Sequence, residues 1–176
     1  MSTLRPVWTL PVRLAHWSLV LLFVYTMLND SGDRWHRYAG YAAAAIVGLR
    51  VLYGLRGDGA ARIRLPRPGA AMAHLREMRS GRTRRIGGHN PLAAAMALLL
   101  WALILLLALS GWISRWDRYW GEDAPVIIHA VLAWTMLACV AVHLAGVVVS
   151  SLLERQNLAR AMLSGRKHVD GADDPP

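Results

Sequence analysis

The apolar stretch at residues 126–153, VIIHAVLAWTMLACVAVHLAGVVVSSLL, constrains the fold of this chain more than any other segment. It is longer than the roughly 20 apolar residues that a membrane-spanning helix needs. It nevertheless contains two histidines, His129 and His143, fourteen residues apart. In a helix this spacing brings the second histidine to within about 40° of the first, about 21 Å further along the axis. The stretch therefore predicts a membrane helix with two imidazoles on one face, at two depths.

Two imidazoles about 21 Å apart cannot share one metal ion, but they suit two separate cofactors stacked across a membrane. An ionisable or polar residue inside a span indicates a functional site by default. Imidazole is also an axial ligand of haem iron. We therefore interpret residues 126–153 as the shared wall of two haem sites.

The composition is typical of a small integral membrane protein. The 176 residues are 55% hydrophobic and 18% charged, with a formal net charge of +9, which a soluble domain seldom combines. A single cysteine, Cys139, excludes a disulfide or a cysteine-ligated iron–sulfur cluster within the chain. The first apolar run is expected to be a retained span and not a cleaved signal peptide. The apolar runs predict four transmembrane helices, at about 12–29, 36–55, 91–113 and 126–153.

The distribution of arginine and lysine sets the expected orientation. The connector at 56–90 and the tail are strongly basic, whereas each of the two other connectors holds two arginines. We therefore expect an all-α, integral membrane four-helix antiparallel bundle, a single domain over residues 1–176 with both termini cytoplasmic. The basic connector is interpreted as lying against anionic membrane lipid, with no nucleic acid as partner. Residues 169–176, acidic and proline-rich, are predicted to be disordered.

Two haems with two axial imidazoles each need four histidines, two at each depth. His16 lies about four residues into the first span, in its cytoplasmic half, and depth pairs it with His143. His36 begins the second span at the outer side, and depth pairs it with His129. The third span has no histidine and is expected only to close the bundle. A lone histidine more often hydrogen-bonds a neighbour, but four at two matched depths favour ligands.

Three further residues are candidate cofactor contacts. Arg50 follows His36 by fourteen residues, so it shares that face at the inner depth, where a haem propionate would pair its buried charge. Gly40, one turn after His36, leaves room for a flat macrocycle. Arg13, one turn before His16, would reach a propionate or the lipid headgroups. Close helix packing at the glycine and a headgroup contact at Arg50 are the alternatives.

Several segments together resemble the bacterial cytochrome b561 family: PVRLAHW, HRYAGYAAAAIVGLRVLYG, GHNPLAAAM and the H-x13-H of the fourth span. That family includes membrane b-type cytochromes that partner nickel–iron hydrogenases and other periplasmic redox proteins. The resemblance covers about residues 6–168. It implies a multi-pass di-haem b protein of the bacterial inner membrane that exchanges electrons with ubiquinone or menaquinone. The axial ligands that it implies fall on the same four histidines.

The predicted function is electron transport in a respiratory chain, between the quinone pool and a periplasmic partner such as a c-type cytochrome. Two candidate positions for the quinone remain open: the connector at 114–125, beside the outer haem, and the basic connector with His89, beside the inner one. Whether the chain forms a homodimer also stays open.

Two other functions remain as alternatives. The first is an enzyme, a superoxide oxidase that reduces quinone. An anionic substrate favours a positive surface, and the outer connectors carry four arginines against five acidic residues, which counts against it. The second is a non-haem four-helix membrane anchor or transporter whose histidines act as relays. That alternative predicts a colourless protein.

Overall fold

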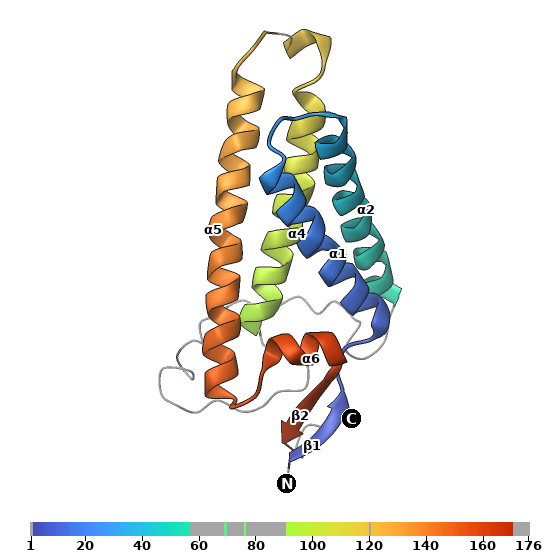
Figure 1. The fold of residues 1–176 in the computed structure, drawn as a ribbon, viewed down its shortest axis with the longest axis vertical. Helices are drawn as coiled ribbons and strands as arrows, with labels where there is room; N and C mark the ends of the chain where they lie inside the picture. The colour runs from blue at the N-terminus through green and yellow to red at the C-terminus, as the bar shows by residue number, and fades with distance from the viewer. Residues whose placement is uncertain (1, 57–68, 70–75, 77–90, 120, 171–176) are drawn as a thin grey trace.

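Four long helices run in alternating directions along one axis (Figure 1). We describe the chain from a computed structural model, which describes residues 2–56, 69, 76, 91–119 and 121–170. The long helices are α1 (Leu10–Leu28), α2 (Arg34–Arg56), α4 (Pro91–Ile113) and α5 (Ala124–Leu153). Each is long and apolar enough to cross a membrane. The expectation of an antiparallel four-helix membrane bundle is therefore confirmed, and the basic connector lies almost wholly outside the described residues.

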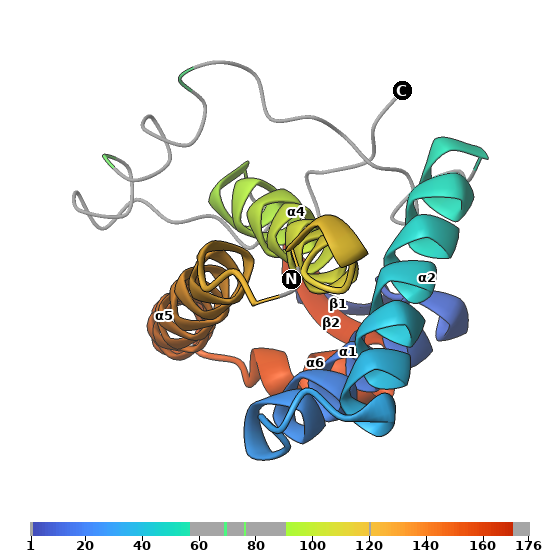
Figure 2. The same ribbon diagram turned by 90° about the horizontal axis from the view of Figure 1, so that it is seen from above.

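The four helices form an arc in the order α5, α4, α2, α1. Close backbone approaches join α4 to α5, α2 to α4 and α1 to α2. Viewed along the bundle, α4 lies between α5 and α2 (Figure 2). Over the described residues, α1 and α5 are not among the helix pairs with extensive backbone contact. The two helices that carry His16 and His143 are therefore the ends of the arc.

Few side chains are buried between the helices, and many leucines and valines face outward. Outward apolar side chains are expected where lipid replaces water as the surrounding solvent. The buried hydrophobic residues are Val7, Val12, Ala39, Val47, Leu103, Met136 and Ala161. The described helices therefore bury few apolar side chains against one another.

The helix α2 begins two residues before the predicted start because Asp33 caps it. The carboxylate of Asp33 accepts the backbone N–H of His36 at 2.8 Å, and its carbonyl accepts that of Arg37 at 3.2 Å. The backbone N–H of His36 is also the main reason why the pKa of Asp33 lies below its usual value. This cap lies in the α1–α2 turn and positions the first turn of α2, which carries His36.

A small structure at the chain ends was not predicted. Strand β1 (Ser2–Pro6) pairs antiparallel with β2 (Arg166–Asp170), and the short helix α6 (Leu158–Ser164) precedes β2. The two strands are an exception to the all-α expectation, and the disorder predicted for 169–176 was wrong for residues 169 and 170. Residues 171–176 lie outside the described part. We call β1, α6 and β2 the terminal cap, and the bundle end that carries it the terminal end.

The terminal cap connects the start of α1 to the end of α5. Lys167 Nζ lies 2.8 Å from a carboxylate oxygen of Glu154, with both side chains largely buried. The guanidinium of Arg13 donates a hydrogen bond to the carbonyl of Leu163 in α6. The opposite end of the bundle carries the α1–α2 turn and the short 3-10 helix η2 (Asp117–Tyr119). We call it the loop end.

Candidate functional site

At the loop end, the structure places His36 of α2 beside His129 of α5. Their ring centroids lie 6.1 Å apart, with the ring planes inclined by 65°. A metal–imidazole nitrogen bond of about 2.0 Å on each side places the centroids of two opposed imidazoles about 6.3 Å apart. The separation of this loop-end pair therefore fits one metal ion held between the two rings.

Hydrogen bonds to the far nitrogens define which ring nitrogens face the metal position. Nδ1 of His36 lies 2.5 Å from the carbonyl oxygen of Asn29, and a carbonyl only accepts, so Nδ1–H is the donor. Nδ1 of His129 lies 2.9 Å from Ser110 Oγ. That hydroxyl donates to the carbonyl of Leu107 at 3.1 Å, so its lone pair accepts from His129. Each neutral ring is left with an unprotonated Nε2, the form that a metal ion requires.

The helix α4 does more than close the bundle, contrary to the expectation for the third span. Ser110 accepts from His129, and Gly111 lies against the same ring. A Cβ added at Gly111 would lie 3.2 Å from Cε1 of His129. Sequence reasoning missed both residues because neither is ionisable. The only sequence signal was a pair of small residues in an otherwise apolar helix, which is common at helix interfaces.

The terminal-end pair consists of His16 in α1 and His143 in α5. An electrostatic interaction couples the two side chains, but among the described residues their rings make no ring contact such as that of the loop-end pair. Nδ1 of His16 is buried and has no hydrogen-bond partner among the described residues. A buried polar atom without a partner is costly, and native structures seldom leave one unexplained. This pair is therefore a second position where a bound group would complete the site.

Arg50 is a buried cation without a matching anion in the described part of the chain. Its side chain is 8% exposed, and its guanidinium carbon lies 5.4 Å from the centroid of the Trp101 ring. The ring face offers a partial cation–π contact, but Nη1 has no hydrogen-bond partner. A carboxylate of a bound group, such as a haem propionate, fits this unpaired donor.

The two remaining predicted contacts differ in what surrounds them. A Cβ at Gly40 would meet no atom within 4 Å, so the space beside it is open, as a flat macrocycle requires. Arg13 contacts Leu163 in the terminal cap, and its Nε is buried without a partner. The open space at Gly40 and the unpaired buried donors of His16 and Arg50 therefore fit haem, whereas Arg13 contacts the terminal cap.

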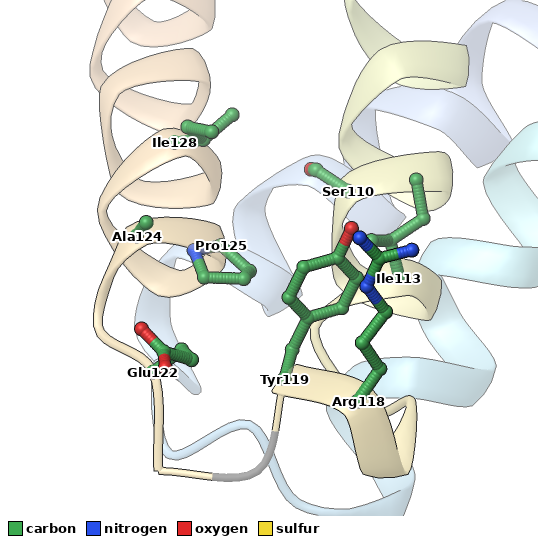
Figure 3. A pocket seen from close by; sticks show the side chains of 8 residues that line it. All are labelled: Ser110, Ile113, Arg118, Tyr119, Glu122, Ala124, Pro125 and Ile128. Carbon is green, nitrogen blue, oxygen red and sulfur yellow. The ribbon is translucent and has the colours of Figure 1, made fainter.

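A pocket of about 410 Å³ lies at the loop end, between the end of α4, η2 and the start of α5 (Figure 3). Apolar side chains form one part of its wall, and polar side chains point in from η2 and the following turn. The lining residues are Ser110, Ile113, Arg118, Tyr119, Glu122, Ala124, Pro125 and Ile128. Because Ser110 also contacts His129, this pocket lies one hydrogen bond away from the loop-end pair.

The sequence of this chain matches one known protein family. The sequence profile described as prokaryotic cytochrome b561 matches residues 7–165, which include all four histidines. No curated protein and no solved structure showed a significant match. Because the match spans most of the chain, the protein belongs to the prokaryotic cytochrome b561 family, whose members are membrane b-type cytochromes of electron transfer.

Proposed function

We propose that this protein is a di-haem b-type cytochrome that carries electrons across the bacterial inner membrane, between the quinone pool and a periplasmic redox partner. The observation that carries the proposal is the loop-end pair, His36 and His129, at the separation of two axial ligands. Haem iron held by two imidazoles supplies one-electron transfer without an open coordination position for substrate. The family membership supports b-type haem as the group that is bound.

Different residues of the chain hold each of the two haems. At the loop end, Asn29 and Ser110 hold the two imidazoles so that each Nε2 is unprotonated. At the terminal end, His16 and His143 provide the second pair of ligands. Arg50 pairs with a propionate, and burial in the arc keeps water from the pair of charges.

The terminal end faces the cytoplasm in this proposal. The terminal cap carries Arg5, Arg166 and Lys167, and cytoplasmic segments of membrane proteins are enriched in such residues. The loop end then faces the periplasm, where a c-type cytochrome or another redox protein docks. Ubiquinone or menaquinone enters from the lipid. The loop-end pocket is one position for its headgroup, and the other, the basic connector with His89, lies outside the described residues.

Pairwise removal of the histidines tests the proposal. His36→Ala and His129→Ala each remove the same haem, as judged by low-temperature reduced spectra and haem content, and the double variant loses no more. His16→Ala removes the other haem. His168→Ala is the control, because His168 lies in β2 outside the spans, and it retains both. Loss of both haems in the His36→Ala/His129→Ala double variant, but one in each single variant, would contradict the pairing.

A further inference from the structure

The two histidine pairs differ in what their far ring nitrogens contact. At the loop end, Nδ1 of His36 donates to a carbonyl and Nδ1 of His129 donates to the hydroxyl of Ser110. At the terminal end, Nδ1 of His16 is buried without a partner. Within the described residues, the ring of His143 also makes no hydrogen bond. The pairs are therefore chemically unequal, although all four ligands are histidines.

This inequality affects how strongly each pair donates electrons to iron. A hydrogen bond from Nδ1–H to an oxygen moves electron density through the ring and makes Nε2 a more basic ligand. A more basic ligand stabilises oxidised iron over reduced iron, which lowers the reduction potential. The loop-end pair has two such hydrogen bonds in the structure, and the terminal-end pair has none among the described residues.

Within the described residues, Ser110 is the side chain that makes this difference, because the other acceptors at the loop-end rings are backbone carbonyls, of Asn29 for His36 and of Leu107 for His129. A serine in a membrane helix can satisfy its hydroxyl by donating to a carbonyl one turn earlier, and Ser114 does only that, at 3.0 Å from the carbonyl of Gly111. Ser110 makes the equivalent bond to Leu107 and in addition accepts from His129.

We propose that Ser110 is a positioning residue for the loop-end haem, and that it makes this haem the lower-potential one of the two. The hydroxyl fixes the tautomer and the orientation of the His129 ring, and the absence of a side chain at Gly111 leaves space for that ring. This inference rests on the di-haem function proposed above. It assigns a role to α4, the one long helix without a ligand.

Redox titration of Ser110→Ala against Ser114→Ala tests the assignment. Ser114 is a matched control in the turn directly after α4, because its hydroxyl donates the same type of hydrogen bond to the carbonyl three residues earlier, and no hydrogen bond joins it to His129 among the described residues. In Ser110→Ala the midpoint potential of one haem rises by about 59 mV, and the potential of the other haem does not change. For a one-electron couple this shift is about a tenfold change in the ratio of oxidised to reduced haem. The low-spin EPR signal of the same haem shifts, because the ring is free to rotate.

Ser110→Thr retains the hydroxyl and restores the wild-type potential. Loss of the loop-end haem alone in Ser110→Ala, with rescue by Ser110→Thr, also supports the assignment. Unchanged potentials in Ser110→Ala, or an equal shift in Ser114→Ala, overturn it. These outcomes are separate from failure of the di-haem function, since a wild-type protein without two haems would show that failure before any serine is replaced.

Discussion

At the scale of single residues, the chain combines ligands that were visible in the sequence with contacts that were not. The spacing of His129 and His143 could be read directly, because the helix period converts sequence separation into face and depth. The contacts of Ser110 and Gly111 with His129 could not, because they depend on the register between α4 and α5. Neighbouring helices can slide by a turn without altering either sequence pattern.

Gly111 is expected to be intolerant of even a single added carbon. In Gly111→Ala the new Cβ meets Cε1 of His129 at 3.2 Å, so the ring must shift by a few tenths of an ångström. We expect the loop-end haem to bind about tenfold more weakly, with the terminal-end haem unchanged, in titrations of the apoprotein with haem. Gly48→Ala is the control, since its Cβ meets nothing within 4 Å. Equal haem affinity in the two alanine variants would rule out the close contact.

Arg50 provides a second test at this scale. Replacing it with methionine keeps much of the length and apolar stem but removes the donor for a propionate. The terminal-end haem should bind about 10-fold to 100-fold more weakly, and its potential should fall because a nearby positive charge is lost. Arg56→Met, at the exposed end of the same helix, should change neither quantity. If Arg50→Met and Arg56→Met changed haem affinity and potential equally, Arg50 would not be the partner of a propionate.

At the scale of elements, the four spans were predictable and the terminal cap was not. The apolar run at about 91–113 predicted the bounds of α4 to the residue, and Pro91 suits the first turn of a helix. The pairing of β1 with β2 joins residues that are 160 to 168 positions apart, and five-residue strands carry almost no pattern of their own. It forms because the bundle brings both chain ends to the same side.

Asp33 should make the start of α2 sensitive to acid. Its pKa is lowered in the folded protein, so its contribution to stability is complete above the unfolded value of about 3.9 and is lost as the pH falls through the lower folded value. The ionisation of Asp33 should therefore cause no change, between pH 5 and 8, in the melting temperature at which the loop-end haem is lost. Asp33→Ala should lower it throughout that range, whereas Asp33→Asn retains an acceptor oxygen. If Asp33→Ala melted at the same temperature as the wild type at pH 7, the role of Asp33 as the N-cap of α2 would be excluded.

The terminal cap should matter most to the terminal-end haem. The terminal cap joins α1 to α5, which have no extensive backbone contact of their own among the described residues, and the Lys167–Glu154 pair connects β2 to the end of α5. In Lys167→Met the carboxylate of Glu154 loses this ion pair and keeps the hydrogen bond from Gln156 Nε2, and breaking a buried pair costs up to about 3–5 kcal/mol. We expect the His16–His143 haem to be lost at lower temperature, with the other unaffected. Arg166→Met, at an exposed neighbouring position, serves as control, and loss of both haems together would contradict this division.

At the scale of the whole molecule, the four candidate ligands come from three helices of the arc. Two of these histidines lie on α5, one on α1 and one on α2, and α4 packs against α5. In the proposed function, one candidate site lies near the loop end and the other near the terminal end. The result is two unequal sites, one near each end of a bundle that crosses the membrane.

The most direct test of the central claim is the haem content of the purified protein. A dithionite-reduced minus oxidised spectrum, with pyridine haemochrome to count haem per chain, should show two b-type haems per polypeptide. The non-haem alternative predicts a colourless protein, and one haem per chain would mean that only one of the two histidine pairs is a ligand pair. Either of those results would contradict the account, and two b haems per chain would support it.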